Sequence, residues 1–185
     1  MDGSRKQWFA GGFLIAIMVM STLGYVLGSS ADTTLSVKYN EYTFKNTKNL
    51  WTAKVQGKER MFAFLPQDVG IDNASILQLI SSTPVLAVSY DPNSTLVESL
   101  AEAQYRLEQE ISSPTIIRGI TQPTGNIAVI TCKNASTTIP VLILQEGNTT
   151  RFSQDNNCII AEAISEADVA RITDRILYTF LGVMS

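Results

Sequence analysis

The chain contains no histidine among its 185 residues. Imidazole is the base in Ser/His/Asp and Cys/His nucleophile systems, and it is a common ligand of zinc. Its absence excludes those catalytic systems and argues against a zinc site. A Ser/Lys or paired-carboxylate enzyme needs no histidine, but no compact group of residues in the sequence indicates one. The sequence therefore predicts no catalytic residue, no cofactor and no metal site.

Charge is also scarce, because only 17% of the residues are Asp, Glu, Lys or Arg, against about a quarter in an average protein. From Asp32 onward there are 12 basic and 16 acidic residues, a net charge of −4, with no Lys/Arg cluster. Nucleic acid is therefore not an expected partner.

Cysteine occurs only twice, as Cys132 and Cys158, each beside a strand-like segment. An even number of cysteines favours a disulfide in an oxidising compartment, and two buried free thiols are the alternative. The wide spacing excludes a local Cys-x-x-Cys redox dithiol.

One long apolar run is present, because residues 8–28 include no charged side chain over 21 positions. As a helix this run would span about 30 Å, the thickness of the hydrocarbon core of a bilayer. It predicts a transmembrane anchor, with the lipid bilayer as its partner. The alternative is a cleaved signal peptide that leaves a secreted protein, since small residues at 26–31 offer cleavage positions.

The orientation follows from the basic residues of the leader, residues 1–7, which contains Arg5 and Lys6. The positive-inside rule places this leader in the cytoplasm. Residues 29–34 then form a short polar tether. Residues 35–185 form one extracytoplasmic domain, anchored to the outer side of the cell membrane.

Four Asn-x-Ser/Thr sequons are typical of exported proteins and provide candidate glycosylation sites. Their asparagines are Asn73, Asn93, Asn134 and Asn148. The alternative is that each sequon is simply a polar turn.

The first part of the domain is expected to contain strands and one short helix. Strands are predicted at 35–44, 51–55 and 61–65, and the last two form a hairpin. A short helix is expected to begin with Asn73 as its N-cap and to end before Pro84.

The second part is predicted to begin with a β-α-β unit, formed by 85–88, 96–111 and 115–120, whose two strands are parallel. The charged face of its helix is expected to be solvated, and on that face Glu102 and Arg106 are spaced as an i, i+4 ion pair. Four further strands, expected to form an antiparallel meander, lie at 127–131, 140–144, 150–153 and 158–163. A last helix, with Ser165 as N-cap, closes the domain. The fold class is α/β or α+β, with one mixed sheet covered by helices.

The segment from Thr138 to Asn148 is similar to the stretch of thioredoxin-like proteins that runs from their cis-proline into a central strand and a turn. The resemblance implies a cis bond before Pro140, packed against the loop at 91–95. It also implies that 85–111 is the strand and helix that flank the family's dithiol. That loop reads Asp-Pro-Asn-Ser here, so the implied redox activity is absent.

The whole chain resembles small single-pass surface proteins that are common in archaeal genomes. The features in common are the N-terminal anchor, a β/α ectodomain with two late cysteines, and a closing Asp-Arg-x-Leu-Tyr helix at 174–178. The resemblance supplies no mechanism.

Asp91 and Pro140 are the candidate ligand-loop residues. Asp91 follows a strand and precedes a helix, which is where open α/β sheets bind ligands. The competing interpretation is an Asp-Pro turn that caps the helix. Asp174 and Arg175, in the last helix, are expected to pair with neighbours or solvent.

These features favour a non-enzymatic anchored domain that binds a protein or a surface glycan, or that has a structural role in the envelope. The enzyme-class alternative is a diverged thioredoxin-like domain that acts in the folding of exported proteins, with Cys132 or Cys158 as a lone reactive thiol. A third possibility is an accessory subunit of a membrane complex.

Overall fold

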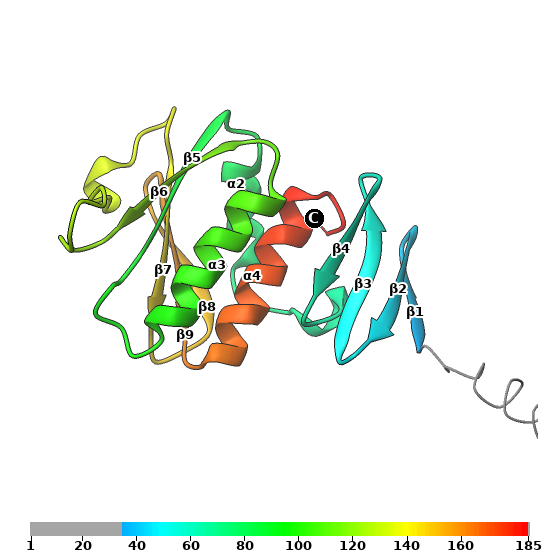
Figure 1. Ribbon diagram of the computed structural model, residues 1–185. Helices are drawn as coiled ribbons and strands as arrows, with labels where there is room; N and C mark the ends of the chain where they lie inside the picture. The colour runs from blue at the N-terminus through cyan, green and yellow to red at the C-terminus, as the bar shows by residue number, and fades with distance from the viewer. Residues whose placement is uncertain (1–34, 185) are drawn as a thin grey trace, which may run out of the picture. The chain divides into compact units, whose positions relative to one another are not determined.

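The computed structural model describes residues 35–184, and the contacts among them form one unit from Ser36 onward. The unit is mixed α/β, as predicted, but it contains two sheets where the sequence predicted one. Helices lie between the two sheets (Figure 1). The expected leader, anchor and tether, at 1–34, lie outside the described residues.

The first sheet is antiparallel, with the order β1-β2-β3-β4. Its strands are β1 (Ser36–Tyr39), β2 (Tyr42–Thr47), β3 (Leu50–Val55) and β4 (Lys58–Phe62). The prediction of a single strand at 35–44 was wrong, because the chain turns at Asn40, which has a positive φ of 51°. Asparagine tolerates this left-handed conformation better than most residues, so it permits a tight hairpin.

The second sheet is mixed, with the order β6-β5-β7-β9-β8. Its strands are β5 (Val85–Tyr90), β6 (Thr115–Ile120), β7 (Val141–Glu146), β8 (Arg151–Asp155) and β9 (Cys158–Ala163). The predicted β-α-β unit is confirmed, since β5 and β6 are parallel neighbours joined through helix α3 (Val97–Glu110).

The antiparallel meander was predicted incorrectly. β9 lies between β7 and β8, and it pairs in parallel with β7 and antiparallel with β8. Four of its six residues are buried, whereas β8 buries only Phe152. The more apolar strand therefore takes the interior position and the polar strand takes the edge.

The strand expected at 127–131 is also absent from the described sheet, where this segment makes only an isolated bridge between Val129 and Ile120. Most of the loop before it is exposed, and Gly125 has a positive φ of 62°. Gly119 leaves room for the Ile130 side chain, because a Cβ at position 119 would lie only 2.6 Å from Cγ1 of Ile130. The segment thus packs onto the end of β6 rather than extending the sheet.

The short helical region after the first sheet consists of η1 (Pro66–Asp68), η2 (Ala74–Leu77) and α2 (Gln78–Ser81). Together, η2 and α2 begin after Asn73, the predicted N-cap position, and end before Pro84, as expected. The Asn73 side chain makes no capping hydrogen bond, however, and donates instead to the carbonyl of Phe152, at 3.2 Å. This hydrogen bond joins the start of η2 to β8.

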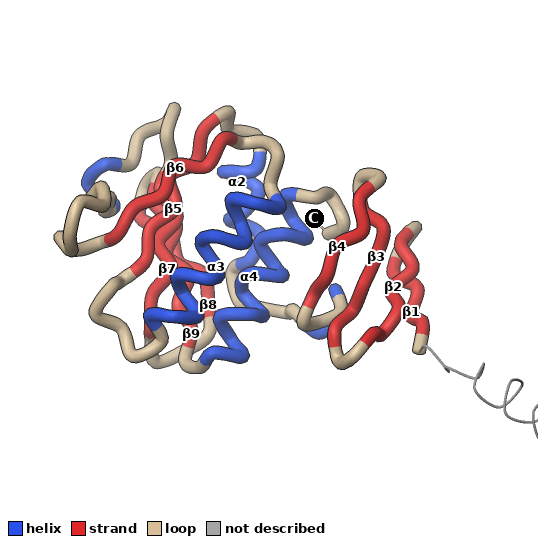
Figure 2. The backbone as a smooth tube through the Cα atoms, in the orientation of Figure 1, coloured by secondary structure: helices blue, strands red, loops and turns tan. Residues whose placement is uncertain are grey.

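The last helix, α4 (Glu166–Phe180), begins as predicted, with the Ser165 side chain accepting from the amide of Asp168. All residues from 172 to 179 are buried, although several are polar. A helix that is buried all round lies inside a protein. Accordingly α4 lies between the two sheets, beside α3 (Figure 2).

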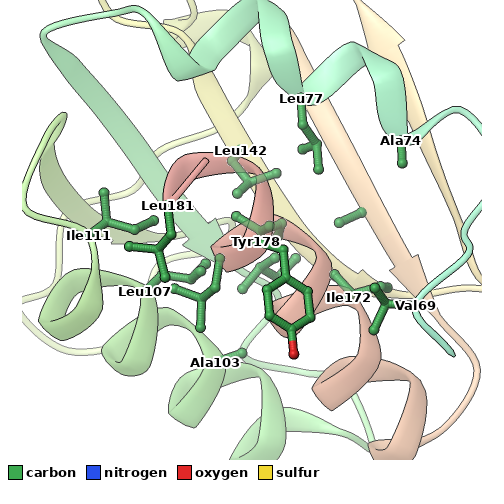
Figure 3. Close-up of a cluster of buried hydrophobic side chains, with 14 of the residues drawn as sticks. Val69, Ala74, Leu77, Ala103, Leu107, Ile111, Leu142, Ile172, Tyr178 and Leu181 are labelled. Atoms are coloured by element: carbon green, nitrogen blue, oxygen red, sulfur yellow. The ribbon is translucent and has the colours of Figure 1, made fainter. Parts of the chain in front are cut away.

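The main core fills both sides of this helix layer. Leu142 of β7, Leu107 of α3 and Ile172 of α4 are among the residues that pack between the helices and the second sheet (Figure 3). On the other side, Tyr178 stacks on Phe62 with ring centroids 4.5 Å apart and meets Phe44 edge-on.

The opposite face of the second sheet has its own small core of Ala87, Val141, Ile143 and Cys158. Residues from the 121–140 loop, including Ile130 and Cys132, pack against it. Cys132, in η3 (Cys132–Asn134), forms the predicted disulfide with Cys158 of β9, so a covalent bond joins this cover to the sheet.

Candidate functional site

A groove of about 470 Å³ opens between α3, α4 and the β3–β4 hairpin. Each of these elements contributes residues to its wall. They are Leu50, Met61, Phe62, Ala63, Ser99, Glu102, Ala103, Arg106, Glu166, Val169, Ala170 and Thr173. The volume lies in the range of small-molecule and side-chain pockets.

The two helices contribute a row of two short side chains each to the groove. Ser99 and Ala103 are four residues apart on α3, and Val169 and Thr173 have the same spacing on α4. Residues four apart lie on one helix face, so each pair forms a short row along the groove. Ala103, Val169, Thr173 and the ring of Phe62 are buried and form its floor.

The rim combines exposed apolar and acidic side chains. Leu50 is 40% exposed and Met61 is 60% exposed. Glu102 and Glu166 are also exposed. Within residues 35–184, neither carboxylate is found in an ion pair or a hydrogen bond.

The cation beside the groove, Arg106, is occupied by partners within the fold. Its Nη2 lies 2.9 Å from Oδ1 of Asp174, and it also donates to the carbonyl of Met61. The predicted ion pair between Glu102 and Arg106 is therefore not formed. Arg106 pairs with the buried carboxylate of Asp174 and not with the exposed carboxylate of Glu102, because an unpaired charge costs more free energy in the low-dielectric interior than in water.

Asp174 is the buried centre of this arrangement, since its side chain is fully inaccessible. Its Oδ2 accepts hydrogen bonds from the amides of Ala63 and Phe64, at 2.7 and 2.9 Å. Burial raises the pKa of this carboxyl, although Arg106 and the two amides oppose the rise. One side chain thereby joins α4, α3 and the segment that follows β4.

Two further buried polar groups join the same layers. Arg60 of β4 pairs with Glu110 at the end of α3, and the same guanidinium donates to the Glu110 carbonyl at 2.7 Å. The Tyr178 hydroxyl donates to the carbonyl of Phe64 at 2.6 Å. Burial raises the pKa of Tyr178, so it stays neutral in the fold.

The polar groups of the predicted ligand loop at Asp91 are hydrogen-bonded to other groups of the protein. Asp91 Oδ1 accepts from the amide of Asn93, which is the turn that the sequence offered as the alternative. At the end of β7, Oε2 of Glu146 accepts from the hydroxyls of Ser94 and Thr95 and from the Thr95 amide, at 2.8 to 3.0 Å. These hydrogen bonds lower the pKa of Glu146.

The structure does not bring Pro140 and Asp91 together. The Pro140 carbonyl accepts from Ala87 at the start of the β5–β7 pair, and the Asp91 amide donates to Leu144 near its end. The bond before Pro140 is trans, and the cis bond of the described chain precedes Pro114.

The remaining predicted residues are the four sequon asparagines and the two cysteines. Asn73, Asn93, Asn134 and Asn148 are all exposed. Cys132 and Cys158 are joined at an S–S distance of 2.08 Å, so neither is the lone reactive thiol of the thioredoxin-like alternative. Sequence reasoning missed the groove, although the spacing of small residues on two amphipathic helices could have suggested it.

Residues 35–184 include no group of His, Cys, Asp and Glu side chains arranged to hold a metal ion. No helix in this part of the chain is long and apolar enough to cross a membrane. The chain matches no protein-family model, no curated protein and no solved structure.

Proposed function

We propose that the chain is a single-pass membrane protein whose 36–184 unit lies outside the cytoplasm and binds a partner protein without catalysing a reaction. The uncharged run at 8–28 and the basic leader support the anchor and its orientation. The observation that carries the binding role is the groove between α3, α4 and the β3–β4 hairpin, which is mainly apolar and open.

The Cys132–Cys158 disulfide supports the location outside the cytoplasm. Disulfides persist in oxidising compartments and are rare in the cytosol. Here the bond has a structural task, because it holds the 121–140 loop over the second face of the sheet. The four exposed sequons are consistent with the same location.

The non-catalytic part of the proposal is supported by how the carboxylates are used. Asp174, Glu146 and Asp91 each accept hydrogen bonds from backbone amides, and they thereby fix loops or join layers. Such groups stabilise the fold, and their own hydrogen bonds limit their use as acids or bases.

The test is the capture of a partner in the protein's own membranes. Intact cells that make the full chain with a C-terminal affinity tag are treated with a short amine-reactive crosslinker, and the tagged protein is purified in detergent. We expect one partner in a fixed ratio to the tagged chain. Recovery of the monomer alone would argue against the binding role.

The same experiment separates two forms of the proposal. A partner with membrane spans of its own would identify the chain as an accessory subunit of a membrane complex. A soluble or surface protein would identify an independent receptor or envelope contact.

A further inference from the structure

We propose that the groove between α3, α4 and the β3–β4 hairpin receives a segment of the partner protein in which a lysine or arginine stands beside large apolar residues. This inference rests on the binding function proposed above. It names the surface that would be used and the chemistry of the occupant.

The shape of the groove fits a long side chain with an aliphatic stem. Its floor is largely apolar, because Ala103, Val169 and the ring of Phe62 lie there beside Thr173, and all four are buried. Lysine and arginine bury their methylene chains along such surfaces while the charged end stays at the rim. Ala170 and Ser99, at the sides, leave room because they are small.

The charge at the rim selects a cation. Glu102 of α3 and Glu166 of α4 both line the groove, are exposed, and pair with no other side chain in the described part of the chain. The guanidinium of Arg106 cannot neutralise them, because Asp174 and the Met61 carbonyl hold it. The rim is therefore negative, and electrostatic complementarity favours a basic group there.

The surroundings of the groove favour a peptide segment over a free amine. Leu50 and Met61 are exposed at its edge, on the neighbouring strands β3 and β4. A small amine would leave both side chains in water. A segment with apolar residues next to its basic residue would cover them, which adds the burial of apolar surface to the charge contact.

The experiment measures peptide binding by the full-length chain in lipid nanodiscs. The probe is an array of short peptides whose central residue is Lys, Arg, Gln or Glu, and whose flanking residues are Leu, Phe or Ser. We expect the tightest binding by peptides with a basic centre and apolar flanks. Raising the salt concentration should weaken that binding.

The double variant E102Q/E166Q removes both rim charges and changes no buried group. We expect its affinity for the basic peptides to fall by about tenfold or more, since a hydrogen bond to a charged group typically contributes that much. The matched control E41Q/E59Q removes two exposed charges from the first sheet, away from the groove. It should bind like the unchanged protein.

A second pair of variants tests shape independently of charge. Ala170→Trp fills the groove and should abolish binding, whereas Ala167→Trp, at an exposed position on the same helix, should not. The inference is wrong if no peptide binds or if Gln-centred peptides bind equally well. It is also wrong if E102Q/E166Q behaves like its control.

The crosslinking experiment in native membranes distinguishes this inference from the binding function itself. If E102Q/E166Q captures the partner as well as the unchanged protein does, the binding function stands and the groove is not its site. If the unchanged protein captures no partner, the binding function fails, whatever the array shows.

Discussion

Asp174 is a charged residue at a position where charge is costly. Its side chain is fully buried, yet two backbone amides and the guanidinium of Arg106 surround its carboxylate. These groups offset the loss of water. The sequence indicated that Asp174 pairs with neighbours or solvent. The structure shows that its partners are protein groups from α3 and from the segment after β4, which no local spacing indicates.

Replacing Asp174 with Asn should destabilise the protein by about 3 kcal/mol, the lower part of the range for breaking a buried ion pair. The amide has nearly the same shape, but it carries no charge for Arg106. Its Nδ2 is also a donor that must face either a guanidinium or a backbone amide, both of which are donors. The free energy of unfolding of the full chain in detergent, followed by tryptophan fluorescence in urea, measures the loss.

The matched control is Glu98→Gln, which removes one exposed carboxylate from α3. A change at such a surface position is usually within about 0.5 kcal/mol. Equal effects of the two substitutions would mean that Asp174 does not hold the layers together.

Glu146 gives a prediction about acid. Its hydrogen bonds to Ser94 and Thr95 lower its pKa below the ordinary value of 4.5. A group whose pKa is lower in the folded state than in the unfolded state stabilises the fold above the unfolded value. This stabilisation is therefore complete above about pH 4.5 and is lost as the pH falls through the lowered pKa.

Glu146→Gln should remove this part of the pH dependence. Hydrogen exchange of the 93–97 amides, compared between pH 3 and pH 6 with correction for intrinsic rates, reports on the loop directly. In the unchanged protein, protection should fall on the acid side. A variant with the same acid-dependent loss would show that another group is responsible.

Among the elements, those defined by local patterns could be predicted from the sequence. The apolar spacing of α3 and the Ser165 cap of α4 are properties of short segments, and the β3–β4 hairpin follows from its turn. Its second strand was misplaced, because β4 is Lys58–Phe62 and the prediction was 61–65. The parallel pairing of β7 with β9 joins segments that are not adjacent along the chain, so no local signal specifies it.

The candidate site was harder to predict than the fold. Its wall combines residues from the β3–β4 hairpin, α3 and α4, and only the packing of these elements places Glu102 and Glu166 on the same groove. The sequence pattern instead paired Glu102 with Arg106, because i, i+4 spacing is visible and the buried Asp174 competitor is not. A site built between elements becomes apparent only after the layers are placed.

The disulfide gives a prediction about the 121–140 loop. Replacing both Cys132 and Cys158 with Ser should lower the free energy of unfolding by about 3.5 kcal/mol, from the entropy of closing a loop across 26 residues. It should also speed hydrogen exchange in 121–140 far more than in α4, because the loop loses its covalent tie to β9. Uniformly faster exchange in both segments would indicate global destabilisation instead.

At the scale of the described unit, α4 takes the central place. It packs on the second sheet through Ile172, and on the aromatic cluster of the first sheet through Tyr178. Polar contacts at Asp174 and Arg60 then fix the first sheet against the helices. Apolar burial and directed polar bonds therefore act on the same interface, beside the groove, and a preorganised surface binds at a lower entropic cost.

The location of the whole molecule can be tested with its own sequons. In a cell with a glycosylating secretory pathway, the full chain should acquire glycans, because Asn73, Asn93, Asn134 and Asn148 are exposed on the unit that we place outside the cytoplasm. Glycosidase treatment should lower the apparent mass, and Asn→Gln changes should remove the shift stepwise. Deletion of 8–28 should abolish it, since this run would direct export. Unmodified full-length protein in the membrane fraction would place the domain on the cytoplasmic side and overturn the proposed orientation.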